Sequence, residues 1–102
     1  MPVALAVARS FPTRTVLCVT TLHVPDAQLM LDVYQLLEFM TGGNVSTATL
    51  SRAMKEVNRF LLHRDPRLGL GWANTPKDRD AMLAWFVQRE TALGPTLELA
   101  PN

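Results

Sequence analysis

The chain has 102 residues, of which 48% are hydrophobic and 19% are charged. This size and composition predict one globular domain, residues 1–102, and exclude a disordered or fibrous protein. The formal net charge is only +1, so no global field attracts the chain to DNA or to an anionic membrane, and any such binding must depend on a local patch.

The first segments of the chain are rich in proline and β-branched residues. Residues 1–13 contain Pro2 and Pro12 and predict a loosely held arm or a short edge strand. Residues 15–24 (TVLCVTTLHV) show no helical stripe and predict a strand that is covered on both faces. A second strand is expected at residues 96–99 (TLEL), where it could pair beside the first.

Three segments are predicted to be helices, two from their apolar spacing and one from a Thr-Pro start at residues 75–76. Residues 26–41 end at Gly42, which can adopt the left-handed conformation that stops a helix. Residues 47–63 precede a proline, and residues 76–92 include an unbroken apolar run at 81–87 that must face the core or a partner. The fold class expected is therefore α+β, with a small two- or three-stranded sheet packed against three helices.

Candidate chemical groups are scattered along the chain. The only cysteine, Cys18, lies in an apolar run, which indicates an inert buried thiol and excludes an internal disulfide. His23 and His63 are far apart and not at a metal-ligand spacing, and no phosphate-binding glycine loop is present. We expect no enzymatic activity, no metal and no cofactor. No stretch has the ~20 apolar residues of a membrane span, so we expect a cytoplasmic protein with no membrane partner.

A basic stripe on the second helical segment, residues 47–63, is the first candidate site. Arg52, Lys55 and Arg59 recur on one side of that segment, and Arg64 and Arg67 follow. Two helical segments around a glycine turn also suggest a DNA-binding helix-turn-helix, in which the second helix enters the major groove. Its candidate contacts are Thr47, Thr49, Arg52, Lys55 and Arg59. The other interpretations are a protein-binding surface and a simple solvated helix face.

Aromatic residues near the C-terminal end form the second candidate site. Trp72 and Trp85 are of a type that is enriched in protein interfaces, although such residues more often belong to a core. With the apolar run at 81–87, they favour a protein partner or self-association as a homodimer. The residues expected to bind a protein partner are Arg52, Lys55, Arg59, Trp72 and Trp85.

Several short motifs occur in a fixed order between residues 16 and 68. They are a Val-Thr-Thr step, a Tyr-x-x-Leu helix that ends in Met-Thr-Gly, a Thr-x-x-Leu-x-Arg helix, a Leu-Leu pair and a Pro-x-Leu. This order resembles a family of small uncharacterised bacteriophage and prophage proteins. The family usually has a glycine after the paired threonines, where this chain has Leu22. The positions that carry the resemblance are Thr20, Thr21, Tyr34, Leu37, Met40, Thr41, Gly42, Thr49 (or Thr47), Leu50, Arg52, Leu62, Pro66 and Leu68.

The resemblance implies a phage context and supplies no catalytic residues. Small phage proteins of this size often act stoichiometrically by binding host machinery, including CRISPR systems. We therefore expect a non-enzymatic phage-type accessory protein that binds a host or phage protein, as an anti-CRISPR-type inhibitor would. The alternative is a helix-turn-helix regulator that binds DNA.

Overall fold

The structure is a computed structural model that describes residues 8–100. It is mostly helical, with one antiparallel sheet of two strands, so the α+β class is confirmed at this coarse level. The elements in chain order are β1 (Arg9–Pro12), α1 (Thr13–Thr21), the 3-10 helix η1 (Ala27–Leu29), α2 (Met30–Thr41), α3 (Leu50–Arg64), the 3-10 helices η2 (Pro66–Gly69) and η3 (Trp72–Asn74), α4 (Arg79–Leu93) and β2 (Thr96–Leu99).

The largest correction concerns residues 15–24, which do not form a strand. Thr13–Thr21 is instead an α-helix, so the described chain has four α-helices where three were expected. Eight of the nine residues of α1 are buried, and only Arg14 is exposed. A helix that is covered on all sides needs no polar face, which is why α1 lacks the helical stripe that was sought in its sequence.

A helix suits this central position because its backbone N–H and C=O groups form hydrogen bonds within the helix. A buried strand would need hydrogen-bonding neighbours on both edges, and the described chain has only two four-residue strands, which pair with each other. The hydroxyl of Thr21 donates to the carbonyl of Leu17 at 2.7 Å, so this β-branched residue is accommodated in the helix. Burial and internal backbone hydrogen bonds therefore decide the conformation of residues 13–21, in spite of their strand propensity.

The sheet joins the two ends of the described chain. Arg9 faces Leu99 and Phe11 faces Leu97 in the antiparallel register. The strand expected at 96–99 is confirmed, but its partner is β1 and not the segment that forms α1. An edge strand is confirmed for residues 9–12 of the predicted N-terminal arm, whereas residues 1–7 of that arm lie outside the described residues.

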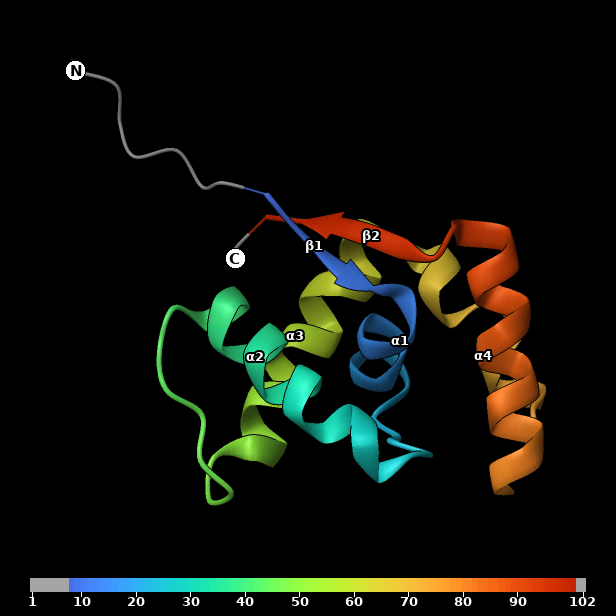
Figure 1. The fold of residues 1–102 in the computed structure, drawn as a ribbon, viewed down its shortest axis with the longest axis horizontal. Coiled ribbons are helices and arrows are strands. Elements are labelled where there is room, and N and C mark those ends of the chain that lie inside the picture. Colours follow the sequence, from blue (N-terminus) through green and yellow to red (C-terminus); the bar gives the residue numbers. More distant parts are fainter. Residues whose placement is uncertain (1–7, 101–102) are drawn as a thin grey trace.

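The helix α1 is the centre of the fold. Figure 1 shows it below the two strands, with α2 and α3 on one side and α4 on the other. It contacts all three of these helices and both strands. The cluster around it includes Leu36 and Leu37 from α2, Val57 from α3 and Phe86 from α4, each no more than 1% exposed. The other helices are therefore held in place mainly by packing on α1.

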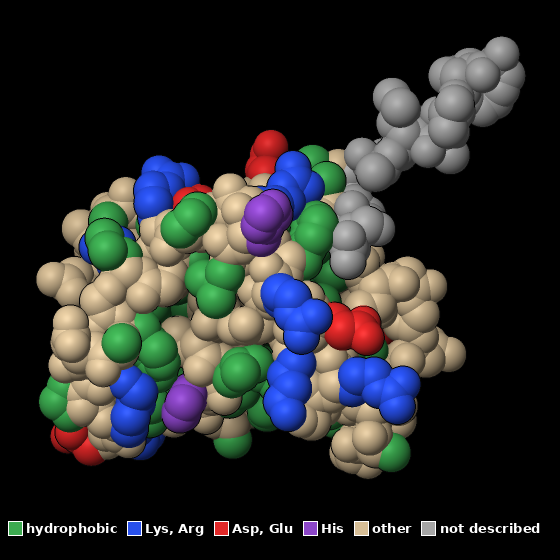
Figure 2. Space-filling view, turned by 180° about the vertical axis from the view of Figure 1, so that it is seen from behind, with side chains coloured by type: hydrophobic (Ala, Val, Ile, Leu, Met, Phe, Trp, Pro, Cys, Tyr) green, Lys and Arg blue, Asp and Glu red, His purple; other side chains and the backbone are tan. Residues whose placement is uncertain are grey.

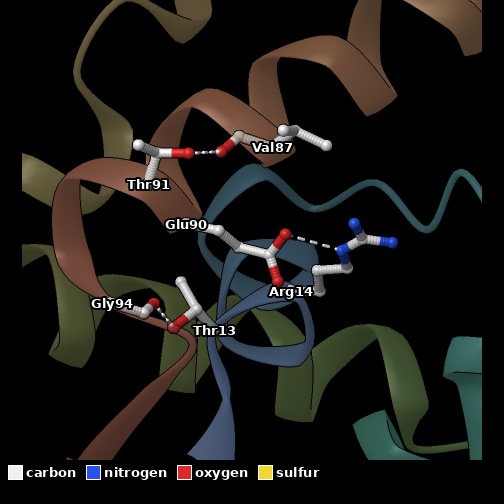
Figure 3. A network of polar contacts seen from close by, with 6 residues as sticks. All are labelled: Thr13, Arg14, Val87, Glu90, Thr91 and Gly94. Carbon is white, nitrogen blue, oxygen red and sulfur yellow. Dashed lines mark hydrogen bonds and ion pairs between the residues drawn. The ribbon is translucent and has the colours of Figure 1, made fainter.

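A polar network joins the start of α1 to the end of α4 (Figure 3). The Thr13 hydroxyl donates to the carbonyl of Gly94 at 2.6 Å, and the Thr13 amide donates to the carbonyl of Pro95 at 2.9 Å. The guanidinium of Arg14 forms an ion pair with Glu90 at 2.8 Å. These contacts tie the first turn of α1 to the end of α4 before the chain enters β2.

The three helices predicted at 26–41, 47–63 and 76–92 are present, with shifted ends. Asp26 caps η1, which leads into α2, and Gly42 ends α2 with a φ of 74°. The helix expected at 47–63 spans Leu50–Arg64. The helix expected at 76–92 begins later, at Arg79, because the carboxylate of Asp78 accepts a hydrogen bond from the amide of Ala81 and provides the cap.

Candidate functional site

The helix α3 presents a buried stripe to α1 and a charged face to solvent. Ala53, Met54, Val57 and Leu61 are buried. The residues expected on the outer side lie there, and Arg52, Lys55 and Arg59 are all exposed. Figure 2 shows Lys and Arg side chains among apolar ones, with few acidic groups, on the side of the molecule that is seen from behind. We call Arg52, Lys55, Arg59 and Arg64 the α3 basic face.

The charges of the α3 basic face are not neutralised within the described chain. The ion pairs among residues 8–100 are Arg14 with Glu90 and Arg67 with Asp65, so neither involves this face. Arg64 places its guanidinium 5.3 Å from the ring centre of Phe60. Glu56 is the one acidic residue within α3, so four cations and one anion leave a local charge of +3.

Arg67, the last of the basic residues that follow α3, is engaged locally. Its guanidinium donates to both carboxylate oxygens of Asp65 at 2.8 Å. The hydrogen bond from Arg67 holds the pKa of the Asp65 carboxyl below its ordinary value. Arg67 is also exposed, but because it is paired with Asp65 it is less available to a partner than the cations of the α3 basic face.

An asparagine that the sequence analysis overlooked sets the position of α3. The side-chain amide of Asn58 donates to the carbonyls of Val19 and Thr20 at 3.0 and 2.7 Å. These carbonyls lie at the C-terminal end of α1, where the Val19 carbonyl otherwise accepts only a 3.3 Å hydrogen bond from the Leu22 amide. Asn58 therefore ties the middle of α3 to the end of α1. The only signal in the sequence was an amide next to the apolar stripe of α3.

The loop before α3 is fixed by α2. The carboxylate of Glu38 accepts a hydrogen bond from the amide of Val45 at 3.1 Å, and the Thr49 hydroxyl accepts one from the amide of Ser46 at 3.0 Å. Both threonines of the DNA-binding alternative, Thr47 and Thr49, precede α3 and are exposed. The eight residues 42–49 separate α2 from α3, whereas a helix-turn-helix has a turn of about three or four.

A shallow apolar groove of about 360 Å³ lies beside the first turns of α3. Leu22, which follows α1, forms part of its wall, and its φ of 59° makes it the one described residue other than glycine in the left-handed region. Leu22 is 43% exposed. Nothing in a leucine predicts this conformation, which glycine or asparagine adopts more readily. The groove is lined by Leu22, Thr47, Leu50, Ser51, Met54 and Lys55.

The two tryptophans expected in the site lie in a separate aromatic cluster. The ring centres of Trp72 and Trp85 are 4.8 Å apart, and the indole of Trp85 donates to the carbonyl of Leu70 at 3.1 Å. Trp72 also packs against His23, and the ammonium of Lys77 lies 4.2 Å from its ring centre. Because Trp85 is only 5% exposed, it anchors the loop before α4 and offers little surface to a partner.

Cys18 lies in the core, as the sequence indicated. It is completely buried, and burial, reinforced by the nearby charge of Asp26, raises the pKa of its thiol to about 12. A thiolate is the reactive form of cysteine, so this thiol is not a nucleophile at neutral pH. Across residues 8–100 no group of three or more His, Cys, Asp or Glu side chains could hold a metal ion.

The chain was also compared with known proteins. No protein-family model, curated protein or solved structure matches it. In the part of the chain that the structure describes, no helix is both long and apolar enough to cross a membrane.

Proposed function

We propose that the protein is a non-enzymatic, phage-type accessory protein that binds a host or phage protein stoichiometrically through the α3 basic face. The observation that carries this proposal is a local charge of +3 on an exposed, firmly held helix, with no ion pair to another described residue. Such a face is complementary to an acidic protein surface and would accelerate association with it. In a phage context, an acidic surface on a host defence complex is a suitable target, as for an anti-CRISPR-type inhibitor.

Two features favour a protein over DNA as the partner. Binding to DNA depends largely on neutralising phosphates, and a protein with 6–10 phosphate contacts would need more cations than the four of this face. The eight-residue connection before α3 also differs from the short turn that holds a recognition helix. DNA binding through Thr47, Thr49, Arg52, Lys55 and Arg59 is therefore the second candidate, and it is favoured only by the exposure of these residues.

The test is a pull-down from the producing cell, with and without nuclease, using matched charge reversals. Lys55→Glu alters the α3 basic face, and Arg79→Glu alters an exposed arginine on α4. Each changes the formal net charge from +1 to −1, so an effect of global charge would appear in both. We expect Lys55→Glu to lose a nuclease-resistant protein partner and Arg79→Glu to keep it.

Direct measurement of DNA binding completes the test. We expect the purified protein to bind a duplex of about three helical turns only weakly at physiological salt. A partner that disappears with nuclease, together with duplex affinity that falls steeply between about 50 and 200 mM salt, would support the DNA-binding regulator instead. Equal retention of a protein partner by Lys55→Glu and Arg79→Glu would contradict the proposed binding face.

A further inference from the structure

The apolar groove beside α3 and the α3 basic face are continuous. Lys55 belongs to both, and Arg52, three residues before Lys55, is its neighbour on the outer side of α3. The groove walls contain aliphatic and thioether side chains from Leu22, Leu50 and Met54, and none of its lining residues is acidic. An apolar side chain flanked by negative charge is therefore complementary to this surface.

Leu22 is unusual at the position that it occupies. Left-handed backbone brings the Cβ of an L-residue close to the following carbonyl, so glycine or asparagine is favoured there. Leucine adds this backbone strain and also leaves 43% of its surface exposed beside the groove. Leu22 is the C-cap of α1, where a left-handed residue commonly ends a helix, and its aliphatic side chain lines the groove.

We infer that the groove holds an aliphatic side chain from an acidic segment of the partner protein, while the carboxylates that flank it pair with Lys55 and Arg52. This inference rests on the proposed function and specifies its partner. Charge complementarity favours an acidic segment, because Lys55 lines the groove and Arg52 is the neighbour of Lys55 on the outer side of α3. The apolar anchor then supplies specificity that exposed ion pairs alone provide poorly.

The probe is a pair of synthetic peptides that differ in one side chain. The leucine peptide is Asp-Glu-Asp-Leu-Asp-Glu-Asp with blocked ends, and the serine peptide replaces its leucine with serine. Binding to isotope-labelled protein is followed by amide chemical shifts. We expect the leucine peptide to bind about tenfold more tightly, as burial of one aliphatic side chain permits, and to shift the amides of Leu22, Ser51 and Lys55.

Two leucine variants form the matched comparison. Leu22→Asn keeps a residue that tolerates left-handed backbone but removes the aliphatic wall, and Leu70→Asn changes an exposed leucine in the loop after α3. Thermal unfolding confirms that both variants fold. We expect Leu22→Asn to lower the affinity for the leucine peptide to that for the serine peptide, and Leu70→Asn to keep the preference.

The failure of this inference can be told apart from failure of the proposed function. A leucine preference that survives Leu22→Asn, or that is absent from the native protein, overturns the groove as the anchor site. If Lys55→Glu still abolishes binding of both peptides, the α3 basic face stands without the groove. Shifts that lie away from Leu22 and α3 overturn both the groove and the face.

Discussion

The helices α1 and α3 pack against each other but have opposite roles. In α1 eight of nine residues are buried, whereas in α3 only four of fifteen are. Substitutions in α1 should almost always disturb the packing, because protein cores are close-packed. The helix α3 has an outer face on which side chains can be replaced with little loss of stability. The comparison indicates that α1 supplies stability and that α3 carries the binding surface.

Truncation of a side chain at the centre of α1 should have the largest effect. Leu17 is completely buried, so Leu17→Ala should reduce the free energy of unfolding by about 3 kcal/mol, although alanine is the better helix former. The matched change on the exposed side of α3 is Arg59→Ala, which should alter it by less than about 0.5 kcal/mol. Denaturant unfolding measures both. A similar decrease in the free energy of unfolding for both variants would contradict the conclusion that α1 supplies stability and α3 does not depend on its outer face.

The hydrogen bonds from Asn58 join the two helices and should have the next largest effect. Asn58→Ala leaves the carbonyls of Val19 and Thr20 without this donor, so we expect a loss of about 2 kcal/mol in the free energy of unfolding. Asn58→Asp should cost more, because it places a carboxylate against two carbonyl oxygens. The exposed neighbour Glu56→Ala is the control. An unchanged denaturation midpoint for Asn58→Ala would show that the end of α1 needs no donor from α3.

The contrast between α1 and α3 also explains what the sequence could predict. Amphipathic spacing located α2 and α3 and placed Arg52, Lys55 and Arg59 on the outside, because a half-exposed helix alternates apolar and polar residues with the helical period. The helix α4 was located by the capping signals at its start. In α1 no exposed side exists to produce that spacing. Its valines and threonines predict a strand, but packing against the other helices makes this segment an α-helix.

The contacts between distant residues of the site could not be predicted from the sequence for a different reason. Asn58 contacts carbonyls 38 and 39 positions away, and the groove brings Leu22 beside the start of α3. Both arrangements depend on how α1 and α3 pack, which local patterns do not encode. The burial of Trp85 likewise depends on the loop that folds back onto α4 through the carbonyl of Leu70.

The thiol of Cys18 gives a pH-dependent test of the burial of α1. The thiol loses its proton near pH 9 when exposed but only near 12 in the fold. Between these values the unfolded state binds fewer protons, so stability falls as pH rises, by about 2 kcal/mol at pH 10.5. Cys18→Ala should lack this contribution. Chemical denaturation of both proteins from pH 8 to 10.5 measures the contribution of the thiol as the difference between their free energies of unfolding. If this difference does not change with pH, the thiol is not buried in solution.

The smallest effect expected within α1 should be a gain in stability. The hydroxyl of Thr15 is buried and has no hydrogen-bond partner among the described residues, whereas the hydroxyl of Thr21 donates to the carbonyl of Leu17. Thr15→Val keeps the shape and removes the unpaired group, so it should increase the free energy of unfolding by about 1 kcal/mol. Thr21→Val removes a hydrogen bond that is made and should decrease it by a similar amount. Because both changes replace threonine with valine in one helix, strand or helix propensity cannot explain opposite signs. Thermal unfolding of the two variants distinguishes these cases, and a loss in both would show that the Thr15 hydroxyl has a partner in solution.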